Sequence, residues 1–202
     1  MDIKFFKVDA LILQKYLLLF NIMKRLISVN NKEDVSGLYK GTPISQLLEY
    51  HNLKKPFEKY SSAQLLVGMC MDHRKKLDIP NNFAYIIRTG GANMRYNEFK
   101  ISYAIAVGGV KHVALIGHDN CGMVGLSSKK EQFVKGLIDN AGWTRKEAEA
   151  HFNNNEPLFE IEDEIDFTLK QTLQYRKKYP KIIIAPLLYK VGDNKLYIIN
   201  ED

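Results

Sequence analysis

The sequence predicts an α/β fold with a mostly parallel central sheet flanked by helices. Apolar runs of strand length cover residues 64–69, 83–88 and 111–117, and a helical pattern over 96–107 separates the second run from the third. Strand, helix and strand in this order form a βαβ unit, which implies a parallel sheet with covered faces. Polar motifs directly follow the first and third runs. The carboxyl ends of strands are where open α/β sheets keep their sites, so we expect the chemistry there.

The composition limits the class of protein. A chain of 202 residues with 46% apolar content fits one domain with a sizeable core. The formal net charge is +6, but basic and acidic residues are interleaved, which argues against a nucleic-acid partner. Two cysteines do not make a disulfide framework. Their polar neighbours indicate metal or nucleophile chemistry in a reducing compartment, so we expect a cytoplasmic protein.

The amino-terminal segment is apolar over residues 10–23 but is interrupted by Gln14, Lys15 and Asn21. It falls short of the ~20 apolar residues that a membrane-spanning helix needs, so no membrane span is expected. Acidic residues replace the basic leader of a signal peptide. We expect an amphipathic arm that packs on a partner subunit. A membrane-surface helix and a biological start at Met23 are the alternatives.

The elements that precede the first strand are an arm, a linker and a helix. Residues 30–42 are polar and indicate a linker, so residues 1–42 are interpreted as an arm and linker. Residues 43–202 then form a single α/β domain. Pro43 opens a short helix over 44–50, because proline is favoured in the first helical turn.

The carboxyl-terminal half contains both helices and strands. Residues 127–157 are helical but polar, and are interpreted as a helical insertion over one edge of the core. An amphipathic helix covers 161–175, and a strand follows at 181–185. A hairpin-like tail pairs 187–191 with 195–199 around a turn that contains glycine, aspartate and asparagine.

The two motifs hold both cysteines of the chain. Cys70, His118 and Cys121 offer two thiolates and an imidazole, which with one open position make a zinc site of the catalytic kind. Asp72 lies two residues beyond the strand-end cysteine and can reach the fourth position of the metal. It accepts a hydrogen bond from bound water, or binds the metal itself when the site is closed. Arg74 can hold that carboxylate in a bidentate contact and keep it ionised.

The spacing of the first motif predicts an extended segment that carries the side chains of Cys70, Asp72 and Arg74 on one side. Two thiolates leave zinc with less positive charge than three histidines would, so the site needs help in generating hydroxide. Backbone N–H groups after Cys121, where Gly122 allows close approach, are expected to orient a substrate or product oxygen. Cys70 as a plain buried residue is the alternative that these neighbours disfavour.

Together the motifs resemble the double signature of the β-class carbonic anhydrases, Cys70-x-Asp72-x-Arg74 and His118-x-x-Cys121-Gly122. Residues 87–91 are similar to the Arg-Asn-Ala-Gly segment of that family. Residues 185–196 are similar to its closing strand pair. The resemblance covers roughly residues 60–200 and leaves the first forty outside.

The resemblance implies four parallel strands, an antiparallel edge strand, and one zinc ion per chain. It also implies a homodimer or a dimer-based homotetramer. In such an assembly the amino-terminal arm of one subunit would wrap around the neighbouring subunit. The implied reaction is the reversible hydration of carbon dioxide to bicarbonate, by attack of zinc-bound hydroxide on carbon. On this interpretation Asp72 orients the hydroxide and Arg74 fixes Asp72. Arg88 either helps to build the dimer or the floor of the site, or is a surface arginine.

Departures from the family pattern leave other functions open. His73 stands where serine or alanine is usual, and the 127–157 segment is unlike most members. A related branch of the same fold hydrolyses carbonyl sulfide or carbon disulfide, and the motif residues do not separate these substrates. A cysteine nucleophile in sulfur or phosphoryl transfer is disfavoured, because Cys70 and Arg74 lack the spacing of phosphatase loops. A zinc- and bicarbonate-binding relative without turnover is the non-enzymatic alternative.

Overall fold

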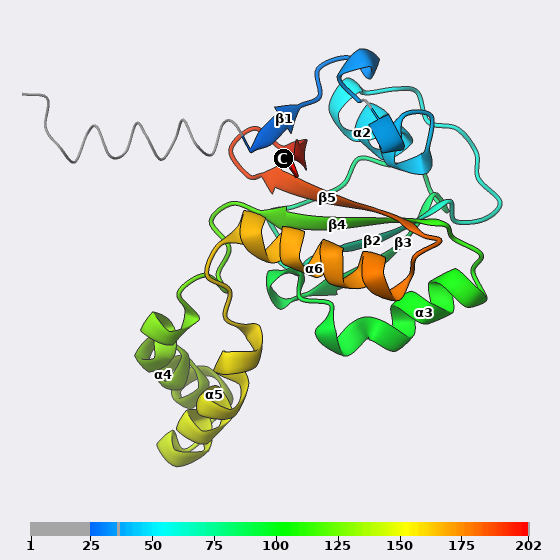
Figure 1. Cartoon of the computed structure of the whole chain (residues 1–202). Helices are drawn as coiled ribbons and strands as arrows, with labels where there is room; N and C mark the ends of the chain where they lie inside the picture. Colours follow the sequence, from blue (N-terminus) through cyan, green and yellow to red (C-terminus); the bar gives the residue numbers. More distant parts are fainter. Residues whose placement is uncertain (1–24, 36, 202) are drawn as a thin grey trace, which may run out of the picture.

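The computed structural model describes residues 25–35 and 37–201 (Figure 1). The apolar segment 10–23, with its expected arm, lies outside the described residues. The described part of the expected arm and linker contributes to the folded body. Ahead of the linker, β1 (Leu26–Ser28) pairs with the last strand, and the linker itself forms two short 3₁₀ turns. Val35 and Tyr39 from these turns are buried in the main apolar core.

One six-stranded sheet forms the centre of the molecule, in the order β1-β6-β5-β4-β2-β3. Its other strands are β2 (Leu65–Cys70), β3 (Ala84–Thr89), β4 (His112–His118), β5 (Ile183–Lys190) and β6 (Lys195–Ile199). Strands β3, β2, β4 and β5 are parallel, which confirms the predicted parallel sheet. Strand β6 is antiparallel to β5, as predicted, but it is not the edge, because β1 pairs antiparallel along its outer side.

The prediction of two separate strands around Pro186 was wrong. Strand β5 runs unbroken through this proline and pairs with β4 along seven positions, from Ile183 to Tyr189. The ladder with β6 begins only at Leu187, directly after the proline. Proline has no N–H to donate to a ladder, so it is tolerated where pairing on one side has not yet begun.

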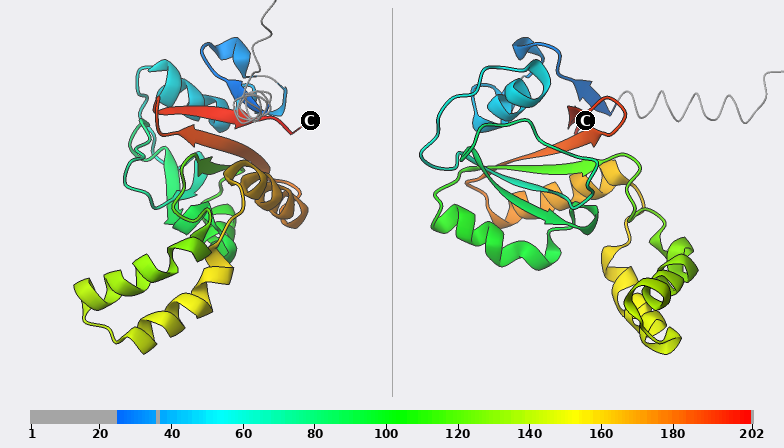
Figure 2. Two further views of the ribbon diagram at one scale, coloured as in Figure 1. Left: turned by 90° about the vertical axis from the view of Figure 1, so that its left-hand side faces the viewer. Right: turned by 180° about the vertical axis from the view of Figure 1, so that it is seen from behind.

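Helices cover both faces of the sheet (Figure 2). Helix α2 (Pro43–Leu53) packs its apolar side on one face, against β2, β4, β5 and β6. Helices α3 (Glu98–Ala106) and α6 (Glu164–Lys178) cover the other face. Along β2, alternate residues enter the two cores, as the two-residue period of a strand requires. The central strands β2 and β4 are buried on both sides, which explains their continuous apolar runs.

Local signals in the sequence set the ends of these helices. Thr42 caps α2 by accepting from the N–H of Ile44, one position after Pro43. Asp163 caps α6 by accepting from the N–H groups of Ile165 and Asp166. The α6 cap fixes where the helix starts. The first residue of the helix, Glu164, reaches the candidate metal centre described below.

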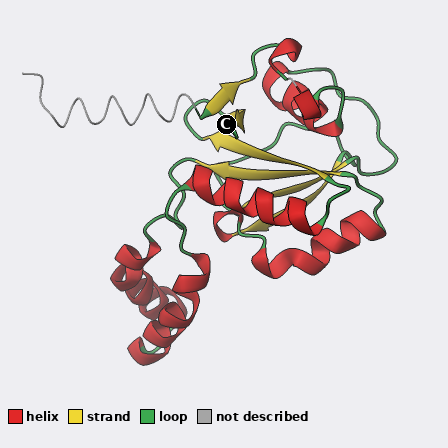
Figure 3. Cartoon of the chain, viewed as in Figure 1, coloured by secondary structure: helices red, strands yellow, loops and turns green. Residues whose placement is uncertain are grey.

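The 127–157 segment is helical, as predicted, but it does not cover the core. Helices α4 (Lys130–Ala141) and α5 (Arg145–Phe159) form a hairpin that projects away from the sheet (Figures 1 and 3). Its few buried side chains, such as Val134 and Phe152, pack within the hairpin. Each of these polar helices has only a narrow apolar stripe, and the two helices bury their stripes against each other.

Candidate metal centre

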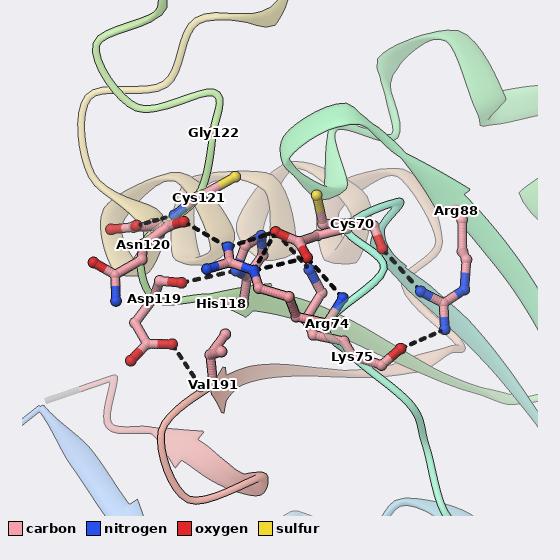
Figure 4. A network of polar contacts seen from close by, with 12 residues as sticks. Cys70, Arg74, Lys75, Arg88, His118, Asp119, Asn120, Cys121, Gly122 and Val191 are labelled. Atoms are coloured by element: carbon pink, nitrogen blue, oxygen red, sulfur yellow. Dashed lines mark hydrogen bonds and ion pairs between the residues drawn. The ribbon is translucent and has the colours of Figure 1, made fainter.

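Two neighbouring strands and one turn bring the three predicted ligands together. Cys70 is the last residue of β2 and His118 is the last residue of β4, and these strands are paired in parallel. Parallel pairing places both carboxyl ends at the same sheet edge, and the turn after β4 returns Cys121 to it. One ligand atom from each of the three side chains lies within 4.8 Å of the other two. All three side chains are buried, and Figure 4 shows them side by side.

The imidazole of His118 is oriented for metal binding. Its Nδ1 lies 2.8 Å from the carbonyl oxygen of Asp119, which can only accept, so Nδ1 carries the proton. Nε2 then presents a lone pair, and it is buried without a hydrogen-bond partner among the described residues. A ring nitrogen that donates to a carbonyl while the other is held without a partner is the usual arrangement of a metal-ligating histidine.

The thiols of Cys70 and Cys121 lie close to each other. A hydrogen bond from Cys121 lowers the pKa of the Cys70 thiol, and the same contact with Cys70 raises the pKa of Cys121. Neither cysteine is bound in a disulfide. A divalent cation would bind both sulfurs and Nε2 of His118. Two sulfurs and one nitrogen are a donor set that zinc prefers, so the residues present fit a zinc ion.

Asp72 and Arg74 form a bidentate ion pair beside the three ligand atoms. Nε and Nη2 of Arg74 donate to the carboxylate of Asp72 at 3.0 and 2.6 Å. These hydrogen bonds hold the pKa of Asp72 well below its usual range. The Oδ2 atom of Asp72 lies 3.9 Å from Nε2 of His118, so the carboxylate borders the ligand cluster. It is an acceptor within reach of anything bound there.

The predicted extended segment was wrong, because a turn follows Cys70. The backbone N–H of Arg74 donates to Oδ1 of Asp72 at 2.9 Å, and the N–H of Lys75 donates to the Asp72 carbonyl at 3.4 Å. Aspartate favours such local hydrogen bonds to the backbone two residues on. The turn, rather than strand alternation, aligns the carboxylate with the guanidinium.

A sequence profile described as carbonic anhydrase matches residues 69–185, which is more than half of the chain and contains both motifs. The chain belongs to the β-carbonic anhydrase family. No curated protein sequence matches the chain.

Solved structures of β-carbonic anhydrases share this fold. The enzyme TvaCA1 from Trichomonas vaginalis superimposes with a TM-score of 0.57 at 17% identity, and the match covers 96% of this chain and 100% of that one. The carbonic anhydrase from Glaciozyma antarctica gives a TM-score of 0.53 at 16% identity and covers 95% of each chain. A carbon disulfide hydrolase gives 0.50 at 20% identity, over 70% of this chain and 80% of the other. At these identities the matches show the fold.

Arg88 contacts the turn that carries Asp72 and Arg74. From strand β3, it donates to the carbonyl of Cys70 at 3.2 Å and to the carbonyl of Lys75 at 3.1 Å (Figure 4). Both contacts hold the turn that carries Asp72 and Arg74. The residue is exposed on edge strand β3, so the site floor, the dimer and the plain surface arginine all stay predictions for Arg88.

The turn around Cys121 is held by residues that the sequence did not reveal. Asn120 adopts a left-handed conformation with φ of 53°, and the N–H of Cys121 donates to Oε1 of Glu164 at 3.0 Å. The ammonium of Lys129 donates to the carbonyls of Gly122 and Val124 at 2.6 and 3.0 Å. Glu164 is distant in sequence from Cys121, and Lys129 contacts backbone carbonyls, which any residue provides, so no local pattern signals either contact.

Gly122 lies next to Cys121 and is exposed. A Cβ atom there would meet nothing within 4 Å, so no neighbouring atom of the chain requires glycine. Its expected role in binding substrate oxygen stays a prediction. Lys75 is a further residue that the sequence did not reveal: within the run Arg74-Lys75-Lys76 it reads as part of a solvated charged stretch, yet its side chain is buried against Asp72.

Proposed function

We propose that the chain catalyses the zinc-dependent, reversible hydration of carbon dioxide to bicarbonate. The observation that carries the proposal is the buried convergence of Cys70, His118 and Cys121 beside a carboxylate that Arg74 holds ionised. Zinc held by these residues would supply Lewis-acid activation of a water molecule. Membership of the β-carbonic anhydrase family supports this chemistry, and the paired motifs contain every residue that it needs.

The residues of the chain have separate roles in this proposal. Asp72 stays ionised at neutral pH, so it can accept but not donate a hydrogen bond. It therefore orients a water or hydroxyl group through its proton, and turns the oxygen lone pair toward the substrate carbon. Arg74 positions the carboxylate. The exposed backbone at Gly122 is proposed to donate an N–H to a substrate oxygen.

Hydrolysis of carbonyl sulfide or carbon disulfide is the second candidate on the same residues, and a zinc- and bicarbonate-binding relative without turnover is the third. Stopped-flow assays of carbon dioxide hydration, carbonyl sulfide hydrolysis and carbon disulfide hydrolysis, on protein of measured zinc content, test all three. We expect one zinc per chain and turnover of carbon dioxide. Zinc at one per chain with turnover of a sulfide alone would favour the second candidate. Zinc without any of these activities would favour the third.

We also propose that the working form is a homodimer or a dimer-based tetramer in the cytoplasm. Strand β3 is an edge strand, and its Tyr85 and Ile86 are exposed. Phe99 and Tyr103 from α3 line the same surface hollow as Tyr85 and Ile86, and Phe99 is 81% exposed. An edge strand beside an apolar patch of this kind is suited to a second copy of the chain. No helix in the described ranges has the length and apolarity to cross a membrane.

A further inference from the structure

Lys75 is a buried lysine that the proposed reaction does not use. Its side chain is 0% exposed, and its Nζ has no hydrogen-bond partner in the part of the chain that the structure describes. The nearest carboxylate oxygen is Oδ2 of Asp72, at 4.0 Å, which is beyond hydrogen-bond range. Arg74 already holds that oxygen at 2.6 Å. The ammonium is thus a buried positive charge with no acceptor in direct contact.

The backbone around Lys75 is fixed. Its carbonyl accepts from Arg88, and its N–H donates to the carbonyl of Asp72. The side chain extends from this turn toward the carboxylate of Asp72, and Figure 4 shows it among the residues of the metal centre. Lys76, the next residue, is exposed. The two neighbouring lysines differ in burial but carry the same charge.

The charge of Lys75 acts on the metal centre through a medium that excludes water. Burial lowers the pKa of Lys75, while the negative charges of Cys70 and Asp72 raise it. A buried charge without a hydrogen-bonded partner is unfavourable by itself, so a compensating negative charge at the site stabilises it. The thiolates and Asp72 supply part of that compensation, and an anion bound at the centre would supply more.

We propose that Lys75 sets how tightly the metal centre binds small monoanions of the bicarbonate class. The inference rests on the proposed function, in which bicarbonate is the product. Lys75 acts through its field rather than by touching the anion, so it is a residue that determines affinity and not a catalytic residue. A unit charge several ångströms away at reduced dielectric changes affinity by at least about tenfold. An exposed charge at a similar distance is screened by water and salt.

The test is calorimetric titration of sodium thiocyanate, and then of sodium bicarbonate, into the zinc-loaded full-length protein. Lys75→Met removes the buried charge and Lys76→Met removes the exposed one. Lys75→Arg keeps a positive charge at the buried position. Zinc content is measured for every sample. We expect the Kd of thiocyanate to rise at least about tenfold in Lys75→Met. It should change less than about twofold in Lys76→Met and return toward the unsubstituted value in Lys75→Arg.

Several results would overturn the inference: equal affinities in Lys75→Met and the unsubstituted protein, equal losses in both Met variants, or no thiocyanate binding at all. If Lys75→Met does not fold, the ammonium NMR signal of the buried lysine in the unsubstituted zinc-loaded protein must move on adding thiocyanate, and an unmoved signal contradicts the proposal. Lys75-dependent binding in a zinc-loaded protein that does not hydrate carbon dioxide would reject the proposed function and keep the inference.

Discussion

The guanidinium of Arg74 donates through Nη2 to the carbonyl oxygen of Asn120, 2.9 Å away. The same group holds the carboxylate of Asp72, so one side chain connects the two halves of the metal centre. The carbonyl comes from the left-handed turn that carries Cys121, while Asp72 follows Cys70. Arg74 therefore sets the position of the proposed orienting carboxylate relative to both cysteines.

The Asp72–Arg74 pair predicts a particular dependence of stability on pH. Asp72 has a folded-state pKa below the ordinary value of 3.8, so the folded state binds fewer protons than the unfolded state near that pH. Its contribution is complete at pH values well above 3.8 and is lost as the pH falls through 3.8 toward the folded pKa. Urea unfolding of metal-free protein and of Asp72→Asn between pH 2.5 and 7 measures it. The free-energy difference should be constant above about pH 5 and shrink below pH 4. A difference that grows on acidification would show that the carboxylate is not stabilised in its ionised form.

Asp72→Asn should retain zinc and lose most activity. The amide has nearly the same shape as the carboxylate but carries no charge and also presents a donor, so it no longer selects one orientation of a bound hydroxyl. We expect kcat for carbon dioxide hydration to fall on the order of 100-fold. Asp78→Asn is the control, because Asp78 pairs with Lys54 away from the centre. Full activity in Asp72→Asn would remove this carboxylate from the mechanism.

Substitution of a ligand should remove the metal. Cys70→Ser replaces a thiolate by a hydroxyl that does not ionise at neutral pH, and His118→Gln removes the ring nitrogen. Elemental analysis of purified proteins should find zinc far below one per chain in both. His112→Gln is the matched control, because His112 and His118 are the first and last residues of the same strand. Equal zinc content in the three variants would show that the metal is bound elsewhere.

Gly117→Ala should destabilise the fold near the centre. A Cβ at this position of β4 would lie 2.4 Å from Oγ1 of Thr168 and 3.1 Å from the carbonyl of Glu164, so α6 must move. We expect the free energy of unfolding to fall by about 1–3 kcal/mol, measured by urea denaturation. Gly192→Ala, where a Cβ would meet nothing within 4 Å, should change it little. Similar values for the two variants would mean that β4 and α6 are not packed this closely.

The apolar face of β3 and α3 should carry self-association. Phe99→Glu replaces the most exposed aromatic ring of this face by a charge, so we expect the variant to be monomeric. Size-exclusion chromatography with light scattering measures its mass. Leu173→Glu is the control, since Leu173 is also exposed but lies on α6. A monomeric unsubstituted protein, or an unchanged mass in Phe99→Glu, would count against this interface.

The sequence predicted the parts of the molecule that depend on local pattern. The buried runs of β2 and β4 and the spacing of Cys70, His118 and Cys121 were sufficient to place a candidate metal site at one sheet edge. Strand β1 was missed because three residues are too few to show a two-residue period. Pro186 was interpreted as a break because the sequence does not reveal that pairing with β6 starts after it.

Contacts between distant segments could not be predicted. Lys75 stands in a basic run that normally indicates a solvated surface. Its burial becomes visible only in the folded turn, where its carbonyl accepts from Arg88 and its side chain lies near Asp72. The contact of Arg74 with Asn120 joins a side chain to a backbone carbonyl, which any residue provides. The amino-acid sequence therefore does not predict such a contact.

X-ray absorption at the zinc edge of the purified protein tests the central claim most directly. If Cys70, His118 and Cys121 hold the ion, the spectrum will require two sulfur atoms at about 2.3 Å and at least one nitrogen at about 2.0–2.1 Å. A first shell made only of nitrogen and oxygen would contradict the account.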